Sequence, residues 1–247
     1  MNPETLSRLA ASVQPLVFET GVPEVPYATK GTVFLVGYRG RAFALTARHA
    51  LNPDHLSPVC IFPSDTSQRI LPLDDVFFVP ATLVPDDFVD LAVIEIDVAN
   101  IEHVELAQAR LIDLALASGD WQSHAHSSEF VILGFPEEHS FVDYAAEEIA
   151  TVRIAMEGRY CGPSSIEYLH ELEIVDGPPL STYSGFSGSP VFALTSHPNG
   201  DTQTVLCGMV LLGTATSRRV HYLDRSVLLD ALKIKCEKQE TVISSSL

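Results

Sequence analysis

Basic residues are scarce in this sequence: 15 lysines and arginines stand against 32 aspartates and glutamates, which gives a formal net charge of −17 over 247 residues. A protein whose main partner is nucleic acid or an anionic membrane needs the opposite balance, because both partners are polyanions. The composition therefore argues against both. The surplus of carboxylates is typical of an ordinary solvated surface, and it would also suit cationic partners.

Long apolar runs are missing as well. None approaches the roughly 18 residues of a membrane span, and residues 1–8 lack the basic start and apolar stretch of a secretion signal. Without a signal or a paired spacing, we interpret the four scattered cysteines as reduced thiols packed as small apolar groups. These features favour a cytoplasmic location. The cysteines are Cys60, Cys161, Cys207 and Cys236.

Metal-ligand spacings are rare. His124 and His126 lie two residues apart, which on a strand would place both imidazoles on one side. A metal site usually needs three or four ligands, and no carboxylate or cysteine partner is evident near this pair. The sequence predicts neither a metal site nor a cofactor.

Most of the chain consists of short apolar segments separated by Gly, Pro, Asp and Ser. This pattern is typical of an all-β barrel or sandwich. We expect a first β-barrel domain over residues 1–108 and a second over 109–247, with 105–118 as the crossing between them. The expected strands are 16–19, 31–37, 41–47, 58–62, 76–79, 91–96, 129–135, 149–156, 166–175, 191–194, 202–212 and 220–223.

Two segments have helical spacing instead. Residues 5–13 place Leu6, Leu9 and Ala10 on one face, which predicts a short N-terminal helix. Residues 224–238 repeat the pattern over a longer stretch, with Asp224 as its expected N-cap. We therefore expect a helix at each end of the two barrels.

A serine lies between two glycines in the stretch GFSGSP, residues 185–190. Glycine tolerates backbone conformations that other residues avoid, so such a turn can aim neighbouring N–H groups at one point beside the hydroxyl of Ser187. Acyl transfer needs this combination of a nucleophile and preorganised donors. Taken alone, the same residues also describe an ordinary loop.

A serine hydroxyl needs a base, and two upstream residues are candidates. His49 follows an apolar strand segment, and Asp90 opens another, DLAVI. The order His, Asp, Ser along the chain is that of the chymotrypsin triad. Alone, His49 also fits a buried core histidine and Asp90 a turn residue. Asp86 and Asp87 are nearby alternatives, but Asp90 is preferred because it begins a strand.

Four motifs occur in order: LTARH at 45–49, DLAVI at 90–94, GFSGSP at 185–190 and CGMVLLGT at 207–214. Together they resemble those of trypsin-like (chymotrypsin-fold) serine peptidases. The greatest likeness is to the bacterial branch with HtrA-type and glutamyl-endopeptidase-type enzymes, here without a PDZ domain. The resemblance covers roughly residues 28–235. It implies two six-stranded antiparallel β-barrels followed by a helix.

The resemblance also assigns roles to residues. Ser187 is the implied nucleophile, His49 its base and Asp90 the group that orients the imidazole, while the N–H groups of Gly185 and Ser187 form an oxyanion hole. Many relatives carry an aspartate before the nucleophile, which pairs with a newly cleaved N-terminus. Phe186 stands there in this chain, so we do not expect activation of that kind.

The specificity pocket is implied in the same way. Its base lies six positions before the nucleophile, at Ser181, and its wall at Leu211, Leu212 and Gly213. A small neutral residue at the bottom of the pocket favours small or medium apolar side chains in the substrate and disfavours Lys or Arg. The alternative, an acidic side chain, would require an inward cation, and the candidates for it are Arg218, Arg219 and His221.

The resulting hypothesis is a serine endopeptidase that cuts peptide bonds of a protein or peptide substrate through an acyl-enzyme intermediate. Two alternatives remain open. One is a catalytically silent trypsin-like module that only binds, although an intact set of His49, Asp90 and Ser187 argues against it. The other is a protease that is active only when an activating protein partner triggers it.

Overall fold

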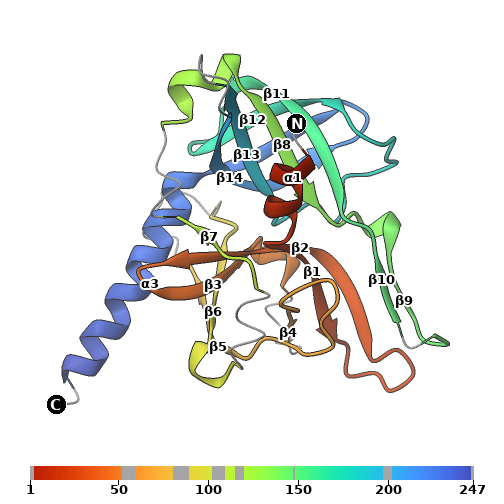
Figure 1. The fold of residues 1–247 in the computed structure, drawn as a ribbon, viewed down its shortest axis with the longest axis vertical. Coiled ribbons are helices and arrows are strands. Elements are labelled where there is room, and N and C mark those ends of the chain that lie inside the picture. The colour runs from red at the N-terminus through yellow and green to blue at the C-terminus, as the bar shows by residue number, and fades with distance from the viewer. Residues whose placement is uncertain are drawn as a thin grey trace.

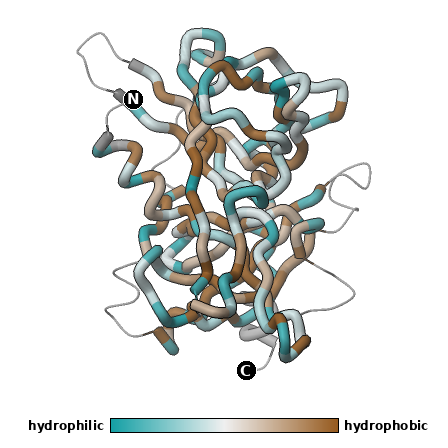
Figure 2. Tube along the Cα trace, turned by 90° about the vertical axis from the view of Figure 1, so that its right-hand side faces the viewer, coloured by the Kyte–Doolittle hydropathy of each residue, from teal (hydrophilic) through white to brown (hydrophobic). Residues whose placement is uncertain are grey.

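The computed structural model describes residues 3–51, 59–79, 89–101, 109–114, 120–146, 148–196 and 202–245. A β-barrel lies above a second β-sheet, and a long helix runs along the flank of both (Figure 1). Hydrophobic segments gather inside both halves, while hydrophilic ones follow the outer turns (Figure 2). The expected mostly β, chymotrypsin-like fold with a helix at each end is confirmed.

The N-terminal half is a seven-stranded sheet, ordered β4-β1-β2-β3-β6-β5, with β7 paired to β2. In the described part of the chain it is a half-barrel rather than the closed barrel expected, because no ladder joins the end strands β4 and β5. The strands are β1 (Val13–Glu19), β2 (Tyr27–Tyr38), β3 (Arg41–Thr46), β4 (Val59–Cys60), β5 (Leu73–Phe78), β6 (Ala92–Ile96) and β7 (Ile112–Asp113).

The C-terminal half is the closed six-stranded barrel β11-β12-β15-β14-β13-β8, and closure leaves no exposed edge. A separate two-stranded hairpin, β9 and β10, projects from it (Figure 1). The elements are β8 (Glu129–Gly134), β9 (Ser140–Asp143), β10 (Glu148–Thr151), β11 (Ile154–Pro163), β12 (Leu169–Asp176), β13 (Pro190–Ser196), β14 (Thr202–Thr214) and β15 (Arg219–Asp224).

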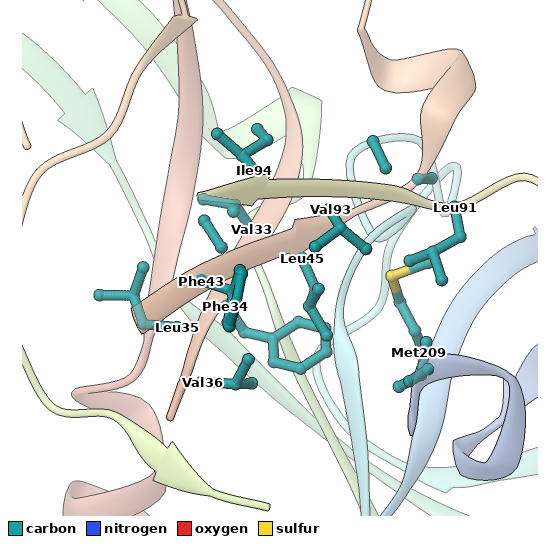
Figure 3. Packing of buried hydrophobic residues seen from close by; sticks show 14 of the residues in the cluster. Val33, Phe34, Leu35, Val36, Phe43, Leu45, Leu91, Val93, Ile94 and Met209 are labelled. Carbon is teal, nitrogen blue, oxygen red and sulfur yellow. The ribbon is translucent and has the colours of Figure 1, made fainter. Parts of the chain in front are cut away.

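The main core joins the two halves. Residues 33–36 of β2 are fully buried, and since successive side chains of a strand point to opposite faces, both faces of this sheet are covered. Met209 of β14 packs in the same cluster as Leu91 from the N-terminal half and lies beside it in Figure 3. The two halves therefore share one packed hydrophobic core.

Helices close the two ends of the chain. Helix α1 (Pro3–Ala10) precedes β1, and α3 (Arg225–Ser245) follows β15. Asp224 caps α3 as expected, since its Oδ1 accepts the N–H of Ser226 at 2.7 Å. The buried Lys235 Nζ of α3 contacts Asp75 Oδ2 at 2.6 Å and Glu95 Oε2 at 3.3 Å, which ties the helix to the N-terminal sheet. None of the helices in the described ranges combines the length and apolar character needed to cross a membrane.

The expected boundary near residue 108 remains a prediction. Residues 102–108 and 115–119 lie outside the described ranges. Between them, β7 pairs in parallel with β2, so residues 112–113 still belong to the N-terminal sheet. The barrel strands of the C-terminal half begin at β8.

Candidate active site

His49 and Asp90 are brought together by the pairing of β3 with β6. Thr46 at the end of β3 lies opposite Ala92 at the start of β6, so the residues just beyond these ends meet. Asp90 Oδ1 accepts the backbone N–H of His49 at 2.7 Å, and its Oδ2 hydrogen-bonds Nδ1 of the same residue. This contact favours the tautomer with a proton on Nδ1, which leaves Nε2 free to accept one.

The loop of Ser187 docks against the turn that carries His49. The carbonyl of Ser187 accepts the N–H of Thr32 at 3.0 Å. A Cβ placed on Gly31 would lie 3.1 Å from that carbonyl oxygen and 3.3 Å from Cβ of Ala50, the neighbour of His49. Strand β2 thus lies between the loop of Ser187 and the turn that carries His49. The close approach of both segments to residue 31 requires a glycine there.

The hydroxyl of Ser187 donates to the carbonyl of Leu211 at 3.1 Å. Among the described residues, no hydrogen bond joins Ser187 to His49. Catalytic hydrogen bonds are often long or misaligned without a substrate, so this geometry does not remove His49 as the base. The structure brings the three predicted residues to one region, with the Ser187 hydroxyl bonded to Leu211 and not to His49.

Two N–H groups of the serine turn lack an acceptor. The N–H groups of Phe186, Gly188 and Ser189 donate to backbone carbonyls at 2.9–3.1 Å, whereas those of Gly185 and Ser187 have no acceptor among the described residues. Backbone donors without a partner are costly when shielded from water, and an oxyanion hole is one use for them. These are the two donors that the sequence predicted.

Glycine is required on both sides of Ser187. Gly185 has a φ of +93°, and a Cβ there would lie 2.3 Å from the carbonyl oxygen of Phe135. Gly188 has a φ of +91°, and its Cβ would lie 2.0 Å from the carbonyl oxygen of Thr32. Both positions combine a left-handed backbone with a close approach of another segment, so any side chain would displace the turn.

The residue after each glycine points inward. Phe186 is fully buried, and its ring meets that of Tyr183 edge-on with 6.2 Å between centroids. Ser189 is also fully buried, and its hydroxyl has no hydrogen-bond partner. A Cβ on Gly134 would lie 2.1 Å from Ser189 Oγ, so this hydroxyl points into the barrel and not toward Ser187.

Thr32 is a site residue that the sequence analysis missed. Its hydroxyl donates to the carbonyl of Gly185 at 2.8 Å and accepts the N–H of Phe135 at 2.9 Å. The carbonyl of Thr32 in turn accepts the hydroxyl of Thr46 at 2.7 Å. Thr32 therefore links the serine turn to β2 and β8. In the sequence, the only local signal for Thr32 is that it follows Gly31 and precedes an apolar run.

Glu138 is a second missed residue. Its carboxylate accepts the N–H of Ser181 at 3.1 and 3.2 Å for its two oxygens, together with the Ser181 hydroxyl. The hydrogen bond from the Ser181 side chain lowers the pKa of Glu138. One residue earlier, the N–H of Glu137 donates to the carbonyl of Ser184 at 3.0 Å. Hydrogen bonds at Ser181 and at Ser184 thus hold the segment that leads into Gly185.

The predicted pocket residues lie in different surroundings. Ser181 is exposed and engaged with Glu138. Leu211 is buried beside the nucleophile, while Leu212 is 51% exposed. Gly213 lies opposite Val220 in the β14–β15 ladder, and Arg219 pairs with Glu171 at 2.6 Å.

The remaining candidates lie elsewhere or outside the described residues. His124 and His126 belong to a 3-10 helix, Gln122–Ser127, and not to a strand, so the expected side-by-side strand arrangement was wrong. Both are exposed, and among the described residues no group of three or more His, Cys, Asp or Glu could hold a metal ion. Asp86 and Asp87 are not among the described residues.

Comparison with known families supports the geometry. The family described as a trypsin-like peptidase domain matches residues 31–200, a range that includes His49, Asp90 and Ser187. A search of curated proteins finds no match.

Proposed function

Because this chain belongs to the trypsin-like peptidase family, we propose that it is a serine endopeptidase acting through His49, Asp90 and Ser187. The observation that carries the proposal is the pair of N–H groups beside the Ser187 hydroxyl that find no acceptor in the described part of the chain, in a molecule that also pairs His49 with a carboxylate. A loop without a catalytic role has no need to leave two such donors free.

In the proposed mechanism the Ser187 hydroxyl first leaves the Leu211 carbonyl and turns toward His49. His49 takes the proton as Ser187 Oγ attacks the scissile carbonyl, and later gives it to the leaving amine. Asp90 holds the imidazole by two contacts, one to its backbone N–H and one to Nδ1. These two contacts fix both the position and the tautomer of the His49 imidazole.

The N–H groups of Gly185 and Ser187 would hold the oxyanion of the tetrahedral intermediate. Each such donor is worth about 3–4 kcal/mol of transition-state stabilisation where it has been measured. Their placement depends on Thr32, which accepts and donates hydrogen bonds on the other side of the turn. Hydrolysis of the resulting acyl-enzyme completes the cycle and needs no metal ion.

One observation favours a second candidate, a protease that a protein partner switches on. The Ser187 hydroxyl is bonded to Leu211 and not to His49, so the described geometry is not yet the reactive one. A partner that reoriented Ser187 would complete the site. The binding module without activity is less favoured, since it does not explain the two free donors.

Labelling with an ethoxy fluorophosphonate, which reacts with activated serines, tests the proposal. Labelling of the purified protein that is lost in Ser187→Ala would support a constitutively active endopeptidase. Labelling that appears only after addition of cell extract would support the partner-activated form. If neither preparation labels under conditions that label trypsin, the assignment of Ser187 as an activated nucleophile is wrong.

A further inference from the structure

The position of the P1 side chain follows from Ser187 and β14. The resemblance to trypsin-like peptidases assigns the wall of the pocket to residues 211–213, and the Ser187 hydroxyl lies 3.1 Å from the carbonyl oxygen of Leu211, so we place a peptide bound at Ser187 beside this stretch. The side chain next to the scissile bond then enters the space between this edge of β14 and the turn over residues 183–185. A Cβ placed on Gly213 would point into that space, toward Tyr183.

Two side chains already occupy it. A Cβ on Gly213 would lie 2.7 Å from Cγ1 of Val220 and 2.9 Å from Cδ2 of Tyr183. Carbon atoms not bonded to each other prefer about 3.5–4.0 Å. A methyl group on Gly213 would therefore collide with both side chains, so Val220 and Tyr183 pack directly against the Gly213 backbone. The three nearest atoms all belong to Val220 and Tyr183, and none belongs to Ser181.

Val220 is the fixed wall of this space. It is fully buried, and it is paired in β15 with Gly213 on one side and Leu172 on the other. Its neighbours Arg219 and His221 point to the opposite face of the strand, because side chains alternate. Arg219 is also engaged with Glu171. On the Val220 side an acidic P1 side chain would therefore meet an aliphatic group, whereas Arg218, the third candidate cation, is close enough to the Tyr183 phenol to oppose the rise in its pKa that burial causes.

Tyr183 is held more loosely. It lies in the irregular segment between β12 and β13 and is only partly buried against the barrel core. Partial burial raises the pKa of its phenol. Among the described residues its hydroxyl makes no hydrogen bond, so packing against Phe186 and Gly213 is what fixes the ring. A ring held by packing alone can turn aside at modest cost.

We propose that the ring of Tyr183 closes the specificity pocket, so that this peptidase accepts only small P1 side chains unless the ring moves aside. The inference rests on the proposed endopeptidase function. It makes Tyr183, and not Ser181, the residue that sets the size limit at P1. With the ring in place, the smallest P1 residues, glycine and alanine, are the ones we expect to be accepted.

Peptides that differ only at P1, Ala against Phe, test this with the wild type, Tyr183→Ala and Tyr183→Phe. Tyr168→Ala is the matched control, since Tyr168 is an exposed tyrosine beside Asp230 of α3, on another face. We expect Tyr183→Ala to raise the ratio of kcat/KM for Phe over Ala by at least about tenfold, the effect of fitting or excluding a few carbon atoms in a pocket. Tyr183→Phe and Tyr168→Ala should leave that ratio unchanged.

Fluorophosphonate labelling of the same proteins separates the two proposals, because the reagent carries no P1 side chain. Equal labelling of wild type and Tyr183→Ala shows that the variant is folded with a reactive Ser187. With equal labelling, an unchanged P1 ratio, or cleavage after Phe by the wild type as fast as after Ala, would overturn the role of Tyr183. Loss of hydrolysis of Ala peptides in the variant with labelling intact would also overturn it. Absence of labelling from every protein would instead reject the endopeptidase function on which the inference rests.

Discussion

Thr32 donates its hydroxyl hydrogen to the carbonyl of Gly185, at 2.8 Å and across 153 positions of sequence. The same hydroxyl accepts the N–H of Phe135. A buried group with both of its hydrogen-bonding functions satisfied holds its neighbours in one geometry. The N–H of Gly185 therefore points where it does because of a residue in the N-terminal sheet.

Replacing Thr32 by Val keeps the shape and removes both bonds. We expect a loss of about 1–3 kcal/mol in the free energy of unfolding, because the Gly185 carbonyl and the Phe135 N–H are left unpaired. The kcat of peptide hydrolysis should fall as well. Chemical denaturation and steady-state kinetics measure the two effects. Thr29→Val is the control, because Thr29 is a partly buried residue of β2 whose hydroxyl makes one long hydrogen bond, 3.4 Å to the carbonyl of Ser140, and an equal loss in both variants would contradict a specific role for Thr32.

Ser187→Ala and Ser189→Ala compare two serines of one turn. Ser187→Ala should reduce kcat by roughly four to six orders of magnitude, as loss of a nucleophile does. Ser189→Ala should keep full activity, because its buried hydroxyl has no partner and its removal costs little. Hydrolysis above a few per cent in Ser187→Ala, with normal circular dichroism, would exclude Ser187 as the nucleophile.

Asp90→Asn tests the orientation of His49. The amide nitrogen of asparagine would face Nδ1 as a donor, which favours the wrong imidazole tautomer. We expect kcat to fall by about 10⁴-fold with little change in KM. Thermal unfolding should change little, since asparagine can still accept the N–H of His49. A loss smaller than tenfold would place the catalytic carboxylate elsewhere in the chain.

Glu138→Ala tests whether the Ser181 contact positions the oxyanion turn. Without the carboxylate the segment leading to Gly185 loses its hydrogen bonds at Ser181 and keeps the one at Ser184, and we expect kcat to fall roughly 10- to 100-fold while KM changes little. Glu137→Ala is the matched control, because that residue contributes its backbone N–H, which alanine keeps. Equal kinetics of the two variants would show that the Glu138 carboxylate has no positioning role.

Asp224 provides a pH-dependent prediction for stability. Burial acts to raise its pKa, but hydrogen bonds from His170 and Ser226 hold the pKa below the ordinary 3.8. A carboxyl group whose pKa is lower in the folded state stabilises the fold above its unfolded pKa and loses that effect as the pH falls through the folded value. Asp224→Ala should cost about 1–3 kcal/mol at pH 7.

The difference in stability between wild type and Asp224→Ala should shrink as the pH falls below about 4. Urea unfolding between pH 3 and pH 7 measures it. Asp230→Ala, at an exposed position of the same helix, should show no comparable difference. If the difference in unfolding free energy between wild type and Asp224→Ala stays constant down to pH 3, the charge of Asp224 does not contribute to stability.

Much of the fold follows from local patterns in the sequence. Short apolar segments with turn residues between them predicted most of the strands, although β9 was not expected and the single strand expected over 149–156 is divided between β10 and β11. The turn at Tyr38–Gly40 joins β2 to β3 with positive φ values at Arg39 and Gly40. The spacing after Asp224 predicted α3. These features depend on residues a few positions apart, so the sequence alone is enough for them.

The candidate site was only partly accessible in this way. His49, Asp90 and Ser187 were proposed from motifs at strand ends, and the two glycines beside Ser187 from their backbone freedom. Thr32 and Glu138 were missed because they act through partners 153 and 43 positions away. A local sequence pattern does not show which strand end will lie next to which turn in the folded chain.

The sequence by itself determined the element types and the chemistry available at Ser187, because both depend on residue identity and short-range geometry. Only the tertiary structure decided that the half-barrel has two end strands without a common ladder, that Ser181 faces Glu138, and that Tyr183 lies against Gly213. Each of these features depends on how segments that are distant in the sequence pack against one another. Protein interiors are closely packed, so which side chain occupies a given space depends on the fold of the whole chain.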